Sequence, residues 1–277
     1  AKDQTGLFLV NSLSKVVRPL YSSEVGENRL NRNLYGACPQ APNLSNFESH
    51  GLAIQTYSND QEVYSLYVVS HGDREAIEVF ELDASSHVPE VTWIGCVLMP
   101  ETLVANDVSA MRDGTILATV LIHPGFGFDD ILSGEPTGGV YKWTPGSDGF
   151  YMLEGSELSG NNGLQVSLDE TEIFVAATGS SAIFTISNNN PTRVLRRTRT
   201  MGFGLGKCDC RGGWIRHGII RSCCPGFGSN QSGGLGHSTH PQRSDAQKRI
   251  SISRSHGIFS QHRQRRRSPY ASGRWRF

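Results

Sequence analysis

Short, mostly apolar runs that alternate with turn signals dominate the first 190 residues of the chain. The runs are rich in β-branched and aromatic residues, and turn-forming pairs such as Asn-Asp, Asp-Gly and Pro-Gly separate them. Short runs of this composition between turn signals are typical of β-strands. They predict strands at residues 6–10, 64–70, 76–82, 115–121, 139–143, 172–176 and 182–186. Many short strands without a competing helical period indicate a sandwich, a barrel or a propeller.

An internal repeat separates these three architectures. Similar segments begin at His50, Asn106 and Asn162, and their starts are 56 residues apart. That period is close to one four-stranded propeller blade with generous loops. Because the innermost strands of a propeller line a central channel, polar residues that open equivalent strands should meet at one mouth. The repeat predicts an all-β fold in which residues 1–190 supply about four blades of a β-propeller.

The net charge of zero conceals two segments of opposite charge. Residues 1–189 hold 8 Lys and Arg against 24 Asp and Glu, whereas residues 190–277 hold 18 against 2. Residues 191–277 form a basic Arg/Ser/Gly-rich tail without strand or helix periodicity, so it should not form a packed core. We expect a tail that is disordered or frameshifted, since out-of-frame translation of a GC-rich gene produces such a composition.

Two other interpretations of the tail are disfavoured by its pattern. An arginine-rich arm that binds nucleic acid would explain the charge, but Lys is scarce and aromatic residues do not recur at a regular pitch. A zinc site on the tail cysteines would need roughly two to four residues between paired ligands. The spacing of Cys208, Cys210, Cys223 and Cys224 does not provide this.

Neither a membrane span nor a leader is visible in the sequence. No run of about 18 apolar residues occurs, and residues 1–4 lack a basic-then-apolar pattern. With 37% hydrophobic residues and 31 glycines, the chain is expected to be soluble and loop-rich. A secreted or periplasmic location would require a leader that had already been removed.

Five motifs, at residues 49–52, 66–73, 77–80, 106–108 and 161–169, resemble the paraoxonase/arylesterase family in order and approximate spacing. They resemble, more distantly, the gluconolactonase and strictosidine-synthase-like propellers. The resemblance covers residues 6–187, and its most specific part is the His-Gly-Leu and Val-Val-Ser-His pair. It implies a calcium-dependent six-bladed propeller that hydrolyses a small-molecule lactone or aryl ester, with promiscuous phosphotriesterase activity.

The resemblance assigns roles to three histidines. His50 and His71 correspond to the family's catalytic pair, and His123 corresponds to a pocket histidine. An imidazole titrates near neutrality, so His50 could take a proton from an attacking water while His71 orients the water or relays the proton. Each of the first two also precedes a glycine, and could simply hold a strand end or a turn.

The resemblance also implies calcium ligands. Asn106 and Asn162 correspond to ligands of a calcium at the channel mouth, and Asp107 with the backbone carbonyl of Leu52 to those of a deeper calcium. Calcium takes six to eight oxygen ligands and tolerates irregular geometry, so amide oxygens are suitable. Asn-Asp and Asn-Gly are also ordinary turn dipeptides.

Two departures from the family pattern predict weak calcium binding. The acidic pair expected before the first strand is missing from residues 1–4, and residues 203–212 hold no Asp-Asn pair. Calcium affinity rises with the charge of the ligands, so neutral amides alone bind it weakly. The chain could therefore be an inactive form of such a hydrolase, and a non-catalytic propeller that binds other proteins is the alternative. Cys38 and Cys96 are predicted to be non-catalytic.

Overall fold

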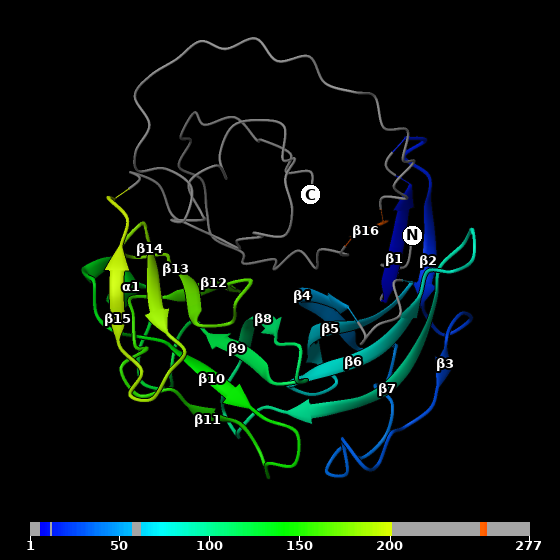
Figure 1. Cartoon of the computed structure of the whole chain (residues 1–277), viewed down its shortest axis with the longest axis horizontal. Coiled ribbons are helices and arrows are strands. Elements are labelled where there is room, and N and C mark those ends of the chain that lie inside the picture. The colour runs from blue at the N-terminus through cyan, green and yellow to red at the C-terminus, as the bar shows by residue number, and fades with distance from the viewer. Residues whose placement is uncertain (1–5, 12, 57–61, 201–249, 254–277) are drawn as a thin grey trace, which may run out of the picture.

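The computed structural model describes residues 6–11, 13–56, 62–200 and 250–253. Its sheets follow one another in an arc, with the first strand of each blade toward the centre and the last toward the rim (Figure 1). The first blade comprises β4 (Phe47–Thr56), β5 (Val63–Gly72), β6 (Ala76–Asp83) and β7 (Glu90–Leu98). The second comprises β8 (Ala105–Ala110), β9 (Ile116–Val120), β10 (Gly139–Trp143) and β11 (Tyr151–Met152). The third comprises β12 (Asn161–Val166), β13 (Glu172–Ala177), β14 (Ala182–Ser187) and β15 (Val194–Arg197).

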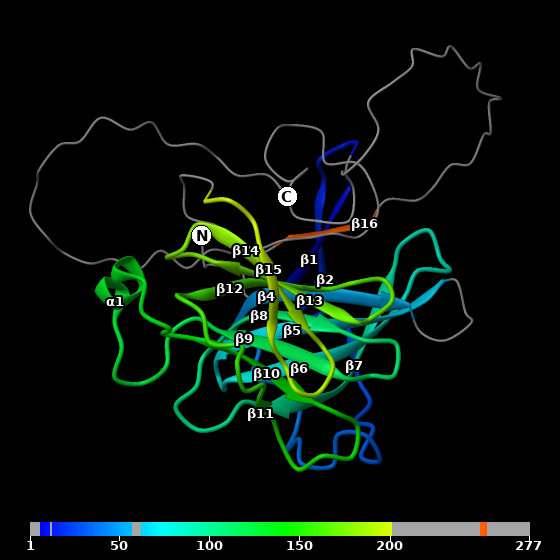
Figure 2. The ribbon, with the colours of Figure 1, turned by 60° about the vertical axis from the view of Figure 1, so that its left-hand side comes forward.

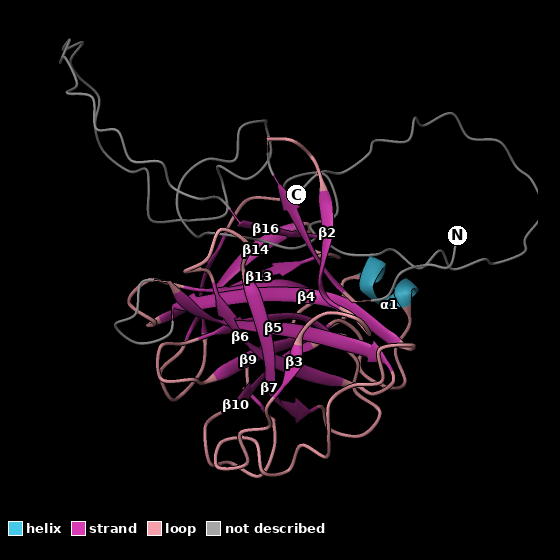
Figure 3. Cartoon of the chain, turned by 90° about the vertical axis from the view of Figure 1, so that its right-hand side faces the viewer, coloured by secondary structure: helices cyan, strands magenta, loops and turns pink. Residues whose placement is uncertain are grey.

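The remaining described elements lie outside these three blades. β1 (Leu7–Asn11) lies between β2 (Val17–Tyr21) and β16 (Ile250–Ser253), and the β1–β2 hairpin projects beyond the blades (Figure 2). β3 (Glu27–Asn28) pairs in parallel with β7. The short helix α1 (Phe128–Ser133) lies at the edge of the strands (Figure 3). Within the described ranges, no helix is long and apolar enough to cross a membrane.

Each strand predicted from a short β-rich run is present, with ends shifted by no more than two residues. Every blade is an antiparallel meander in chain order, and β8 contacts both β4 and β12. Contact between successive first strands places them on the inside of the arc, as in a propeller. The all-β propeller architecture expected from the repeat is therefore confirmed.

Several elements were not predicted, for identifiable reasons. β2 contains Pro19, which cannot donate to a strand ladder. β15 is exposed along its whole length and shows no alternation, although it completes the third blade beyond residue 190. β16 falls in the segment predicted to be a tail. The rest of that segment, residues 201–249 and 254–277, lies outside the described residues, as do its four cysteines.

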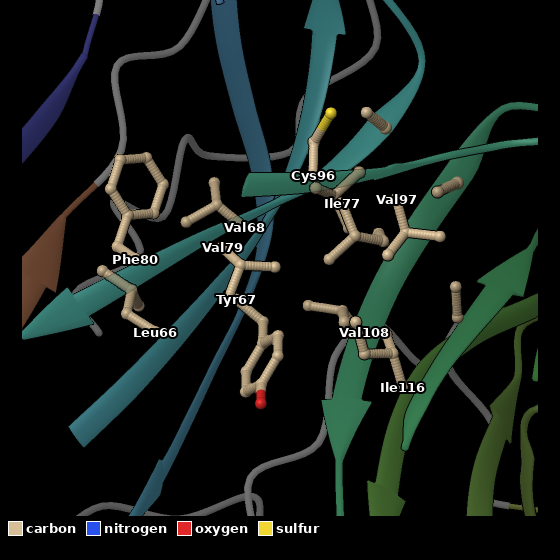
Figure 4. Close-up of a cluster of buried hydrophobic side chains, with 14 of the residues drawn as sticks. Leu66, Tyr67, Val68, Ile77, Val79, Phe80, Cys96, Val97, Val108 and Ile116 are labelled. Carbon is tan, nitrogen blue, oxygen red and sulfur yellow. The ribbon is translucent and has the colours of Figure 1, made fainter. Parts of the chain in front are cut away.

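The middle blade is buried on both of its faces. On β9, Ile116 belongs to the apolar cluster shared with the first blade, whereas its neighbour Leu117 belongs to the cluster shared with the third. Figure 4 shows Val108 and Ile116 of the second blade in the same apolar cluster as Val79 and Val97 of the first. Successive side chains of a strand point to opposite faces of the sheet, so a blade that packs between two others carries apolar residues on both faces.

A disulfide anchors the segment before the first blade. Cys38 and Cys96 are bonded, with their Cα atoms 5.2 Å apart, and Cys96 lies on β7. Both cysteines are almost completely buried. Neither can supply a thiolate nucleophile in this state, which agrees with the non-catalytic role predicted for them.

Removing the disulfide should lower the free energy of unfolding. The bond joins residues 58 positions apart, so it restricts the unfolded chain considerably. We expect the double variant Cys38→Ser, Cys96→Ser to lose about 2–4 kcal/mol in urea unfolding. A reductant should destabilise the wild type by a similar amount and leave the variant unchanged. Equal stability of the two proteins under oxidising conditions would contradict this assignment.

Candidate functional site

Each inner strand carries a β-bulge at the residues that begin the 56-residue repeat. The pairing register shifts at His50 and Gly51 on β4, at Asn106 on β8, and at Asn162 and Gly163 on β12. A bulge leaves a residue outside the regular ladder and changes the direction of its side chain. The repeat thus marks one structural position, at the same end of three inner strands.

The first two of these positions are in direct contact. His50 Nε2 lies 2.8 Å from Asn106 Oδ1, so a side chain from the first blade is hydrogen-bonded to one from the second. With the amide oxygen as acceptor, His50 carries its proton on Nε2. The ring of His71, at the end of β5, lies beside that of His50, with 5.3 Å between centroids. The predicted histidine pair is therefore brought together, next to Asn106.

His71 has a carboxylate partner that sequence reasoning missed. Glu75 Oε2 lies 2.8 Å from His71 Nδ1, across the turn that joins β5 to β6. Glu75 belongs to none of the motifs quoted for the family resemblance. Its four-residue spacing from His71 is a usable signal only once the intervening segment is known to be a turn.

Asp107 connects the three inner strands. It is buried, and its Oδ2 accepts a hydrogen bond of 3.0 Å from the backbone N–H of Leu164 on β12. On the other side, a Cβ at Gly51 would lie only 2.7 Å from Asp107 Oδ1. Glycine is required there because β4 and β8 approach so closely. Leu52, whose carbonyl was assigned to a deeper calcium, follows Gly51 directly on β4.

Asn162 is linked to the second blade through a threonine. The Thr119 hydroxyl accepts from the backbone N–H of Asp107 at 3.1 Å and donates to the backbone carbonyl of Asn162 at 2.6 Å. The Asn162 side chain donates through Nδ2 to Thr178 Oγ1 at 3.1 Å. That bond fixes the amide plane and leaves Oδ1 as the atom suited to a cation.

His123 contacts its own blade. Its Nε2 lies 3.0 Å from the Tyr141 hydroxyl on β10, and its backbone N–H donates to Thr137. Burial lowers the pKa of His123 below its ordinary value, while the charge of Glu157 acts in the opposite direction. His123 follows β9 at the end where Val120 pairs with Ala105, which is the end that carries the bulges. It therefore lies at the same end of the blades as His50, but in a separate polar contact.

The described residues offer oxygen donors rather than a dense acidic cluster. No group of three or more His, Cys, Asp or Glu side chains suited to a metal occurs among them. The oxygens near the bulges belong to two amides, one carboxylate and backbone carbonyls. Such a set is of the type that calcium accepts, and its low charge is typical of a weak site.

Comparison with models of protein families finds no match, and neither does comparison with curated protein sequences. The solved structures that resemble the chain distantly include two enzymes. One is a luciferin-regenerating enzyme, at 15% identity and a TM-score of 0.32, matched over 53% of this chain and 46% of the enzyme. The other is a gluconolactonase from Xanthomonas campestris, at 18% identity and a TM-score of 0.36, matched over 61% of this chain and 68% of that one. The chain spans about half the length of the first of these enzymes, and the chemistry of the site is argued from the chain's own residues.

Proposed function

We propose that the chain carries the site of a calcium-dependent hydrolase of lactones or aryl esters, of the paraoxonase/arylesterase type. The observation that supports this most strongly is the contact of His50 with Asn106, with His71 alongside. The two histidines can accept a proton, and the amide oxygen of Asn106 beside them can bind a cation.

The oxygen donors around the bulges fit calcium in kind. Asn106 and Asn162 would hold the ion at the mouth, and Asp107 with the Leu52 carbonyl would hold a deeper one. An amide oxygen has two lone pairs, so Asn106 Oδ1 can accept from His50 and still bind a cation. When bound, the ion supplies stabilisation of the oxyanion that develops on the substrate carbonyl.

His50 is the proposed general base. Because Nε2 donates to Asn106, Nδ1 is the nitrogen of the neutral ring that can take a proton from water. Asn106 holds the ring in one orientation, and His71 packs against it. The ring is thus positioned before any substrate arrives, which reduces the entropy lost in reaching the transition state.

Hydrolysis of phenyl acetate and of a γ-lactone, with and without a calcium chelator, tests this function. We expect slow hydrolysis that the chelator abolishes and that added calcium, but not magnesium, restores. Calcium should also raise the midpoint of thermal unfolding, since an ion that binds only the folded chain stabilises it. If neither hydrolysis nor stabilisation by calcium is observed, the result favours the alternative of a non-catalytic binding module.

Asn162→Ala should raise the calcium concentration needed for half-maximal stabilisation or activity. The loss of one amide ligand is expected to weaken binding about tenfold, equivalent to 1.4 kcal/mol. Asn188→Ala is a matched control, because Asn188 follows β14 at the opposite end of the same blade. An equal calcium response of the two variants would remove Asn162 from the site.

A further inference from the structure

The turn between β5 and β6 brings the Glu75 side chain into contact with His71. Gly72 has φ of 83°, in the left-handed region, and an added Cβ would overlap the backbone oxygen of Asn46. The turn is also tied down by Asp73, whose carboxylate accepts from the backbone N–H of Asn43 at 2.9 Å. The backbone therefore reverses in a fixed way, and the side chain at position 75 returns toward the end of β5.

Neighbouring residues of this turn take different partners. Arg74 makes two hydrogen bonds to Glu78, at 2.8 and 2.9 Å, on one face of the blade. Glu75 instead meets His71, with side-chain exposures of 34% and 18%. The carboxylate of Glu75 is thus directed to the histidine rather than to the adjacent arginine. Partial shielding from solvent strengthens such a contact relative to a fully exposed pair.

We propose that Glu75 is a positioning residue that holds His71 in the tautomer protonated on Nδ1, so that Nε2 is the nitrogen offered to the site. The proposal rests on the proposed function and adds to it a residue that lies outside the motifs of the family resemblance. A carboxylate accepts only from the protonated nitrogen of a neutral imidazole, so the partner of one nitrogen sets the state of the other.

The two rings of the pair then carry opposite tautomers. His50 donates through Nε2 to Asn106, and His71 donates through Nδ1 to Glu75. Each ring is hydrogen-bonded through a different nitrogen, Nε2 in His50 and Nδ1 in His71. Asn106, His50, His71 and Glu75 thus form a connected group, in which the two rings are neighbours and each is hydrogen-bonded to one polar partner.

Nitrogen-15 NMR of the full chain, labelled at histidine, tests the tautomer without requiring activity. Spectra are recorded about two pH units above the ordinary imidazole value of ~6.5, where neutral rings dominate. His71→Gln identifies the His71 signals. We expect wild-type His71 to be protonated on Nδ1, and Glu75→Ala to shift it to a mixture or to Nε2. Glu75→Gln should keep the Nδ1 proton, because the amide oxygen can still accept it.

Glu90→Ala is the matched control. Glu90 is exposed and lies at the opposite end of the first blade, where its backbone is opposite that of Asp83 in the β6–β7 pairing. It should leave the His71 signals unchanged. A wild-type His71 protonated on Nε2 would overturn the proposal, even if every variant failed to fold. Retention of the Nδ1 proton in a folded Glu75→Ala variant would overturn it as well.

The kinetic readout separates this inference from the proposed function. If hydrolysis is measurable, Glu75→Ala should lower kcat by about 10- to 100-fold with little change in KM, and Glu75→Gln should restore most of the loss. A rate unaffected by Glu75→Ala would overturn the positioning role. Absence of hydrolysis together with the expected tautomers would refute the proposed function and leave the assignment of His71 standing.

Discussion

Replacing His50 by Gln is expected to lower kcat for lactone or phenyl ester hydrolysis by on the order of 10²- to 10⁴-fold, the usual size of a general-base contribution. Glutamine can place an amide N–H where His50 Nε2 donates to Asn106, so the contact between the two inner strands can persist. What it lacks is a nitrogen that accepts a proton near neutral pH. The effect should therefore appear in kcat, with little change in unfolding free energy.

His87→Gln is the matched control for this substitution. His87 is exposed in the loop between β6 and β7, at the opposite end of the first blade. It should leave kcat unchanged. Hydrolysis that survives His50→Gln and resists a chelator would show that the reaction occurs elsewhere on the chain.

Arg74→Met should destabilise the fold by about 3–5 kcal/mol at neutral pH, the usual cost of leaving a buried charge without its partner. The Glu78 side chain is fully buried and accepts two hydrogen bonds from Arg74 and one of 2.7 Å from Trp93 Nε1. Without Arg74, only the indole N–H would remain as a partner among these contacts. Urea unfolding of the variant and the wild type measures the difference.

The pH dependence identifies the mechanism of this loss. Burial raises the pKa of Glu78, and Arg74 opposes this shift. Removal of Arg74 should therefore raise the pKa of Glu78 further. A raised pKa means that the folded state binds more protons than the unfolded state, so the stability of the fold decreases as pH rises above the pKa of Glu78 in the unfolded chain. The deficit of Arg74→Met should therefore be larger at about pH 8 than at about pH 5.

Arg29→Met provides the comparison for the buried pair. The Arg29 side chain is 67% exposed and pairs with Glu81 on the same blade. Exposed pairs of this kind contribute about 0–1 kcal/mol. Equal losses for the two arginine variants, or a deficit for Arg74→Met that is independent of pH, would contradict the account of Glu78.

Strands that form short apolar runs between turn signals could be predicted from the sequence, because burial on the sheet faces determines which residues are apolar. The inner strands were found differently, through the spacing of His50, Asn106 and Asn162. The structure explains why that signal works, since each residue occupies a bulge at the same end of its strand. A bulge favours particular residue types at its position, so the bulges can be recognised in the sequence as a repeat.

Features that depend on pairing between distant segments could not be predicted in this way. The outer strand β15 is exposed, so burial imposes no pattern on it. The Cys38–Cys96 bond depends on where the chain before β4 crosses β7. The contact of Glu75 with His71 depends on the geometry of a turn. All of the assigned site roles, those of His50, His71, Asn106, Asn162, Asp107, Leu52 and His123, remain predictions.

A crystal structure of the full chain, grown with calcium, tests the central claim most directly. We predict density for a cation at about 2.3–2.6 Å from the side-chain oxygens of Asn106 and Asn162. The His50 ring should remain bonded to Asn106 and stand beside the open coordination positions. A cation bound elsewhere, or His50, Asn106 and Asn162 on separate faces of the molecule, would contradict the account.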